Sequence, residues 1–142
     1  MKNDTQQALR LLDSRGYTCV VCKDGATFTA THRGVRPLLD WLTEGTDLRG
    51  FCAADKVVGR ATAFLYVLLG VEEVYAHVMS RPAAEVLRAH NILVEAGTYV
   101  DGIINRTGTG PCPFESAVLN ISEPEEALAA IHAQREQLRT GG

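Results

Sequence analysis

The sequence has no basic excess and no long apolar run. Its 14 Lys and Arg residues stand against 17 Asp and Glu, for a net charge of −3, whereas a surface that binds duplex nucleic acid needs a surplus of cations. The longest apolar stretch, Ala63–Leu69, is far shorter than the roughly 20 residues that cross a bilayer as a helix. We therefore expect no duplex nucleic-acid partner and no membrane insertion.

Repeats, low-complexity blocks and long linkers rich in Pro, Gly or Ser are also missing, which argues against a multidomain or fibrous protein. The chain has 142 residues, of which 46% are hydrophobic. A chain of this length buries roughly two-thirds of its unfolded surface and needs no disulfide to hold a core. The sequence therefore predicts a single domain over residues 1–142.

Cysteine is sparse, and its pattern does not predict disulfides. The polar start of the chain, Met1–Gln7, does not resemble a signal peptide, so we expect a cytoplasmic protein with free thiols. Cys19 and Cys22 have the spacing of a metal clamp, but they lie in a β-like run. Because residues three apart on a strand point to opposite faces, we interpret this pair as strand packing and not as a metal site.

Local patterns predict a mixed α/β chain. Two β-like runs flank Asp24-Gly25, which is typical of a hairpin with a type I′ turn. In chain order, the predicted elements are a helix at residues 4–14 capped by Asp4 or Thr5, strands at Tyr17–Lys23 and Ala26–Thr31, helices at Pro37–Thr43 and Asp55–Leu69, a strand at Glu73–Met79, a helix at Pro82–His90, strands at Ile92–Glu95 and Thr98–Ile104, a helix at Pro113–Leu119, and a last helix opened by Glu123–Glu126 and ending near Leu138.

The segment Asp55–Leu69 is apolar nearly all round and stops at Gly70, which predicts a central, buried helix. Gly59 inside it is interpreted as a point of close backbone packing. A hairpin followed by alternating strands and helices predicts a mixed sheet with helices on both faces. The expected fold is therefore a three-layer α/β/α sandwich.

This element order resembles the cytidine-deaminase-like fold. The resemblance implies a zinc ligand and a general-acid Glu at the start of the central helix, and a P-C-x-x-C motif at the start of the next one. The corresponding places are Cys52–Lys56 and Ser80–Val86, where Ala83 and Val86 stand in place of the two cysteines. Since a hydrolytic zinc ion needs three protein ligands, we expect no metal, no cofactor and no zinc-dependent deamination.

The chain further resembles a small family of uncharacterised prokaryotic proteins placed in that superfamily. The likeness is carried by residues 54–61 (Ala-Asp-Lys-Val-Val-Gly-Arg-Ala) and 104–115 (Ile-Asn-Arg-Thr-Gly-Thr-Gly-Pro-Cys-Pro-Phe-Glu). It covers most of the chain and implies the fold together with a homodimer or larger oligomer. No activity follows from it.

Asp55 and Lys56 are the first candidate site residues. Placed at the start of the predicted central helix, the helix dipole and the Lys56 ammonium would attract an anion, and Asp55 would act as a general base or accept a ligand hydroxyl. The structural alternative is that Asp55 is an ordinary N-cap and Lys56 a solvated cation. Both interpretations remain open.

Cys112 and Glu115 form the second candidate pair. If Pro113 opens a helix, Cys112 stands near its N-terminus, where the dipole favours thiolate over thiol, and Glu115 lies close enough to shuttle a proton. Alternatively, the Pro-Cys-Pro turn is only rigid and Glu115 completes a capping arrangement. The sequence leaves a reactive thiol and a structural turn both possible.

Asn105 and Arg106 precede a polar loop that contains Gly108 and Gly110. Arg106 is suited to pair with a phosphate or carboxylate, with support from loop amides. The structural alternative is that the glycines supply positive φ and Arg106 braces the loop.

Three functions are consistent with these residues. The first is a metal-free relative of the deaminases that binds a small anionic or nucleotide-like ligand between Asp55 and Lys56 on one side and Arg106, Cys112 and Glu115 on the other. The second is a small-molecule enzyme with Cys112 as nucleophile or Asp55 as general base. The third is a catalytically inactive, oligomeric interaction protein.

Overall fold

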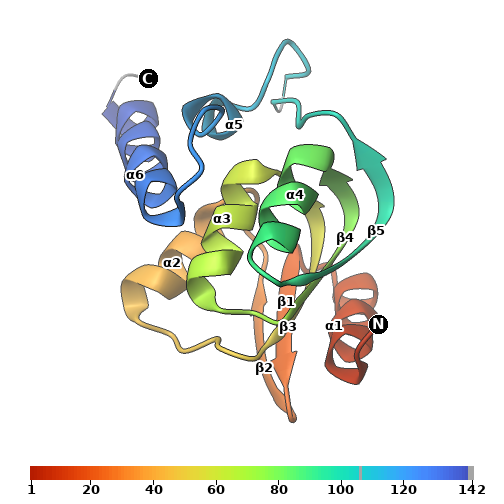
Figure 1. Cartoon of the computed structure of the whole chain (residues 1–142). Helices are drawn as coiled ribbons and strands as arrows, with labels where there is room; N and C mark the ends of the chain where they lie inside the picture. The colour runs from red at the N-terminus through yellow and green to blue at the C-terminus, as the bar shows by residue number, and fades with distance from the viewer. Residues whose placement is uncertain (106, 141–142) are drawn as a thin grey trace.

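A five-stranded mixed sheet lies at the centre of the computed structural model, which describes residues 1–105 and 107–140 (Figure 1). The strands follow the order β2-β1-β3-β4-β5. β1 runs antiparallel to both of its neighbours, whereas β3, β4 and β5 are parallel to one another. The strands are β1 (Cys19–Lys23), β2 (Ala26–Ala30), β3 (Cys52–Val58), β4 (Glu73–Ser80) and β5 (Leu93–Val100).

Helices cover both faces of this sheet (Figure 1). One face carries α1, and the larger core on the other face lies under α3 and α4, with α2 and α6 packed on α3. The predicted mixed sheet between helical layers is therefore confirmed. Among the described helices, none combines the length and apolarity needed to cross a membrane. The helices are α1 (Asn3–Arg15), α2 (Arg36–Glu44), α3 (Arg60–Leu69), α4 (Arg81–Ala89), α5 (Pro113–Ala117) and α6 (Pro124–Thr140).

The predicted hairpin is confirmed in its turn type, and the prediction that Cys19 and Cys22 point to opposite faces of the sheet is also confirmed. Asp24 and Gly25 have φ values of 48° and 87°, as both central residues of a type I′ turn require. Cys19 packs into the core under α3, while Cys22 packs into the core under α1. The two thiols therefore lie on opposite faces of the sheet, and all four cysteines are free.

The predicted helix at Asp55–Leu69 is wrong over Asp55–Val58, which belong to the central strand β3, and is confirmed from Arg60 on. This strand lies between β1 and β4, and its first four residues, Cys52–Asp55, are all buried, so they show no alternation of buried and exposed positions. A short apolar run of this kind has no periodicity that separates a buried strand from a buried helix. Gly59 ends the strand and is the N-cap of α3.

Two further predictions need correction at the edges of elements. The predicted strands Ile92–Glu95 and Thr98–Ile104 are one strand, β5, which stays extended through Gly97. A Cβ at Gly97 would lie 2.9 Å from the His77 carbonyl oxygen, so glycine permits the close approach of β4.

The predicted caps of the first helix, Asp4 and Thr5, are also wrong, because the N-cap is Lys2. Thr5 is buried and donates its hydroxyl hydrogen bond to Glu73 Oε1 at 2.5 Å. The Lys2 backbone N–H donates to the same oxygen at 2.8 Å. A buried carboxylate of β4, and not a side chain of α1 itself, therefore accepts the hydrogen bonds at the start of α1.

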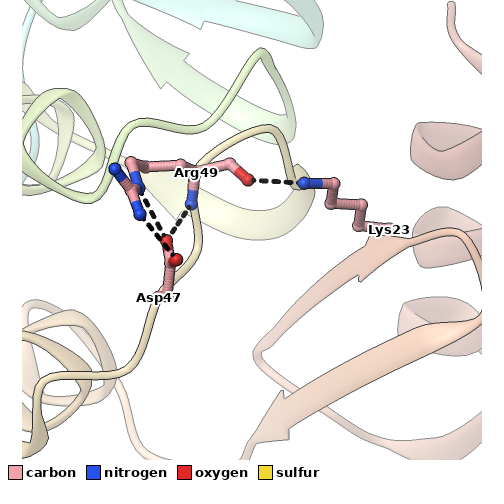
Figure 2. Close-up of polar contacts among 3 residues, drawn as sticks. All are labelled: Lys23, Asp47 and Arg49. Carbon is pink, nitrogen blue, oxygen red and sulfur yellow. Dashed lines mark hydrogen bonds and ion pairs between the residues drawn. The ribbon is translucent and has the colours of Figure 1, made fainter.

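Polar contacts hold the loop that feeds β3 into the sheet (Figure 2). The Arg49 guanidinium donates to both Asp47 oxygens at 2.9 Å, which lowers the pKa of the Asp47 carboxyl from its ordinary 3.8 to about 2. Lys23 Nζ donates to the Arg49 carbonyl at 3.1 Å. These contacts fasten the loop to the end of β1, beside which β3 begins.

Candidate functional site

A cleft of about 980 Å³ opens beside the carboxyl end of β3. In open α/β sheets, ligands bind beyond the carboxyl ends of parallel strands, where neighbouring connections diverge. β3 leads into α3 and β4 on one side, whereas its other neighbour, β1, runs in the opposite direction. The cleft walls come from β1, residues 32–37 and 39, the start of α3, residues 103–105, 107 and 112–115, and α6.

The structure brings most of the candidate residues to this one cleft. Asp55 and Lys56 line it from β3, and residues 105, 112 and 115 line it from the segment around α5. Arg106 lies outside the described residues. Stretches that are far apart in the sequence thus share one cavity, while their chemical roles stay predictions.

Asp55 lies at the floor of the cleft and is only 7% exposed. Tyr66, which is fully buried in α3, donates a hydrogen bond to Asp55 Oδ2 at 2.7 Å. The Cys19 sulfur lies 3.1 Å from the same phenolic oxygen. While the Tyr66 hydrogen is given to Asp55, the Tyr66 oxygen is free to accept one from the Cys19 thiol, and Cys19 also interacts with the Asp55 carboxyl. The three groups therefore form one buried network.

Burial changes the acid–base chemistry of this network. Desolvation raises the pKa of the Asp55 carboxyl from 3.8 to about 7, although hydrogen bonds from Tyr66 and from backbone amides oppose the shift. Desolvation also raises the pKa of the Cys19 thiol and of the Tyr66 phenol well above their ordinary values. Asp55 is therefore the member of the network that gains and loses a proton near neutral pH.

The prediction that Asp55 and Lys56 stand at a helix start is wrong, since both belong to β3. Neither the N-cap role of Asp55 nor the dipole of a helix beginning there applies. The Asp55 carboxylate instead accepts a long hydrogen bond, 3.3 Å, from the Val57 amide of its own strand. Lys56 is exposed, and its ammonium forms no hydrogen bond or ion pair with another described residue.

Glu115 does not complete a capping arrangement within its own turn, while its proton-transfer role stays a prediction. Its carboxylate accepts hydrogen bonds from the Arg60 amide (2.6 Å) and the Ala61 amide (2.8 Å), so it caps α3 and not its own helix. The Arg60 guanidinium in turn donates to the carbonyls of Val118 and Ile121, beyond α5. These contacts hold the α5 segment as a wall of the cleft.

Gly59 permits this cap, because a Cβ at that position would overlap the Glu115 carboxylate. We expect Gly59→Ala and Glu115→Ala each to lower the free energy of unfolding by about 1 kcal/mol, the usual cost of a lost helix cap. Since both changes break the same contact, the double variant should lose little more than either single one. Urea denaturation of the four proteins measures this, and strictly additive losses would contradict the shared-contact explanation.

Cys112 is the N-cap residue of α5 and is partly buried at the cleft wall. The helix that follows has only five residues, Pro113–Ala117. Cys112 forms no side-chain cap hydrogen bond, so the predicted position near a helix start is confirmed but a capping role is not. Its reactivity stays a prediction.

Asn105 uses its side chain within its own loop. Its Oδ1 accepts hydrogen bonds from the Thr107 hydroxyl and the Thr109 amide, both at 3.1 Å, and its Nδ2 donates to Thr109 Oγ1 at 3.3 Å. Gly108 has the positive φ expected of it, 72°, whereas Gly110, for which positive φ was also expected, does not adopt the left-handed conformation. In the described part of this loop, Asn105 therefore shapes the wall and has little capacity left for a ligand.

Three arginines of the cleft were missed by the sequence analysis. Arg33 and Arg36 come from the segment that leads into α2, and Arg135 from α6. Arg36 and Arg135 share one carboxylate, Asp40, over 3.8 and 3.9 Å, whereas Arg33 pairs with no described residue. No motif marks these residues, because only the packing of α6 and α2 against α3 brings them together.

The residues at the starts of α3 and α4 do not fit a hydrolytic zinc ion. α3 begins at Gly59, Arg60 and Ala61, and the Ser80 hydroxyl at the start of α4 accepts a hydrogen bond from the Ala83 amide. None of these side chains is a thiolate, imidazole or carboxylate ligand. Over residues 1–105 and 107–140, no three His, Cys, Asp or Glu side chains gather as a metal site would require.

Comparison with known proteins supports the fold. A family model described as a domain of unknown function (DUF1893) matches residues 7–134. A DUF1893 family protein from Thermotoga maritima shares the fold, with 22% identity and a TM-score of 0.86 over 94% of this chain and 91% of that chain. A weaker likeness, with a TM-score of 0.43 and 20% identity over 66% of this chain and 35% of that one, is to a diaminohydroxyphosphoribosylaminopyrimidine deaminase/5-amino-6-(5-phosphoribosylamino)uracil reductase from Thermotoga maritima. No protein with a curated description matches the sequence.

Proposed function

This chain belongs to the DUF1893 family, and we propose that it binds a small organic anion, such as a nucleotide, in the cleft beside β3. The observation that carries the proposal is the charge of the cleft. Four cationic side chains line it, in a chain whose net charge is −3. They are Arg33, Arg36, Lys56 and Arg135.

Asp40 offsets one charge of the Arg36 and Arg135 pair, and the two carboxyl groups that line the cleft do little to cancel the remaining cations. Glu115 is committed to the amides at the start of α3. Asp55, with a pKa of about 7, is only partly ionised at neutral pH. The cleft therefore carries a positive surplus at a place where water is partly excluded, which strengthens its attraction for an anion.

The remaining walls favour a ligand with an apolar or aromatic part. Leu39, Ile103 and Phe114 line the cleft together with two prolines. Its volume of about 980 Å³ is at the upper end of the range for small-molecule sites. Apolar walls with a few convergent polar groups are the usual composition of such sites. The ligand is thus expected to be amphipathic, with a charged group near the cations.

The proposal predicts that nucleoside monophosphates raise the melting temperature, whereas the uncharged nucleosides do not. Arg33→Gln with Lys56→Gln should weaken nucleotide affinity about tenfold or more, because each charge-assisted hydrogen bond contributes about 1.5–3 kcal/mol. Arg10→Gln is the matched control, since Arg10 lies on α1 and hydrogen-bonds to Gln7, away from the cleft. Calorimetric titration measures the affinities. Equal binding by the double variant and the control would refute the proposal, as would no stabilisation by any nucleotide.

One observation favours an enzyme as the second candidate. A buried carboxyl whose pKa is near 7, at the floor of a cleft, is suited to general acid–base catalysis. Asp55 would be the catalytic residue and Tyr66 a positioning residue. Turnover of a small anionic substrate that is lost in Asp55→Asn but kept in Cys112→Ser would favour this function with Asp55 as the acid–base group.

A further inference from the structure

We infer that the cleft takes up its organic anion together with one proton, which Asp55 carries. This inference rests on the proposed function and adds to it a regulation of the same site by pH. It follows from the position of the Asp55 carboxyl in the cleft, from its hydrogen-bond partners, and from the lack of a described cation paired with it.

The Asp55 carboxyl has no cation of its own. Its oxygens receive hydrogen bonds from Tyr66 and, over 3.3 Å, from the Val57 amide, and the Lys56 amide and the Cys19 thiol also interact with it. No described Lys, Arg or His side chain forms an ion pair with it. An anion held by the cleft cations would therefore meet an uncompensated carboxylate at the floor. In a poorly solvated cavity, two like charges repel far more strongly than they do in bulk water.

A proton on Asp55 removes this repulsion and supplies a hydrogen-bond donor at the floor. Burial raises the pKa of the carboxyl to about 7, so the proton is available near neutral pH. When the cleft is empty, the network of Cys19 and Tyr66 donates toward the carboxylate and supports its ionised form. The Asp55 carboxyl is thus stabilised in its ionised form by hydrogen bonds when the cleft is empty, and it is protonated when the cleft holds an anion.

The other titratable groups around Asp55 explain a coupling between anion binding and proton uptake less well than Asp55 does. Cys19 and Tyr66, packed directly against it from β1 and α3, have pKa values that are raised well above their ordinary values and stay protonated. Histidine is the one other residue type here that changes charge between pH 5 and 8. The charged and titratable residues at the walls are His32, Arg33, Arg36, Lys56, Glu115 and Arg135.

The test uses 8-anilinonaphthalene-1-sulfonate, an amphipathic anion whose sulfonate stays ionised across the range. Its affinity, measured by fluorescence, should be about tenfold weaker at about pH 8 than at about pH 6, as expected when binding requires a proton on a group with a pKa near 7. Asp55→Asn should bind with an affinity that does not change with pH. His32→Gln should keep the pH dependence of the unmodified protein.

Calorimetry in two cationic buffers of different ionisation enthalpy measures the proton directly. At about pH 7 we expect uptake of about half a proton per bound anion, and none in Asp55→Asn. Binding that is equal at both pH values, or a pH dependence that disappears in His32→Gln but not in Asp55→Asn, overturns the inference and leaves the proposed function standing. Failure of the anion to bind at any pH overturns both.

Discussion

Replacing Asp55 by Asn is expected to stabilise the folded protein at alkaline pH, although it removes a hydrogen-bonded side chain. The pKa of Asp55 is about 7 in the folded state against an ordinary 3.8. Between these values the folded state binds more protons than the unfolded state, so stability falls as pH rises from about 4 to about 7. Each pKa unit corresponds to about 1.36 kcal/mol, so the ionised carboxyl costs about 4 kcal/mol above pH 7.

Urea denaturation of the unmodified protein and of Asp55→Asn at several pH values measures this effect. The difference in free energy of unfolding should be small at about pH 4 and grow to several kcal/mol by about pH 8, since titration of all other groups cancels in the comparison. A difference that does not change with pH would mean that Asp55 titrates normally. A growing difference would mean that this carboxyl is retained at the expense of stability, as functional groups often are.

Removing the Tyr66 hydroxyl is expected to have the opposite effect on stability. In Tyr66→Phe, Asp55 Oδ2 and the Cys19 thiol both lose the Tyr66 hydroxyl as a hydrogen-bond partner. A hydrogen bond to a charged group contributes about 1.5–3 kcal/mol. The free energy of unfolding should therefore fall by about 2 kcal/mol at about pH 8, where Asp55 is ionised. The fall should be smaller at about pH 5, where Asp55 is protonated.

Tyr99→Phe is the matched control, because the Tyr99 hydroxyl lies at the surface of β5 and accepts one hydrogen bond from Arg88. Its stability loss should be small and nearly the same at both pH values. Denaturation curves at the two pH values compare the two variants. An equal loss for Tyr66→Phe at both pH values would contradict the role of Tyr66 in stabilising the ionised carboxyl.

Local chemistry in the sequence predicted much of the fold. The Asp24-Gly25 turn, and the glycines after α1, α2 and α3, fix backbone conformations without tertiary help, so the hairpin was predicted correctly, as were the ends of these three helices to within one residue. The central strand β3 was missed because its first four residues are all buried, which removes the alternation. Gly59 was interpreted as an interior helix residue for the same reason.

The site was less accessible to sequence reasoning. Residues 55–56 and 112–115 do meet at one cleft, but the local argument for Asp55 as a helix cap failed with the helix itself. Glu115 caps α3 across more than fifty residues of sequence, and Tyr66 reaches Asp55 from inside the core. The arginines converge only through helix packing. Each of these roles depends on tertiary contacts that no local pattern carries.

The central claim is that a buried Asp55 carboxyl at the floor of an anion-binding cleft exchanges its proton near neutral pH. The most direct measurement is the pH titration of the Asp55 carboxyl carbon by nuclear magnetic resonance, with and without saturating 8-anilinonaphthalene-1-sulfonate. The account predicts a midpoint near pH 7 in the free protein and a higher midpoint with the anion bound, because a nearby negative charge favours the protonated form. A midpoint near 4, or one that the anion leaves unchanged, would contradict it.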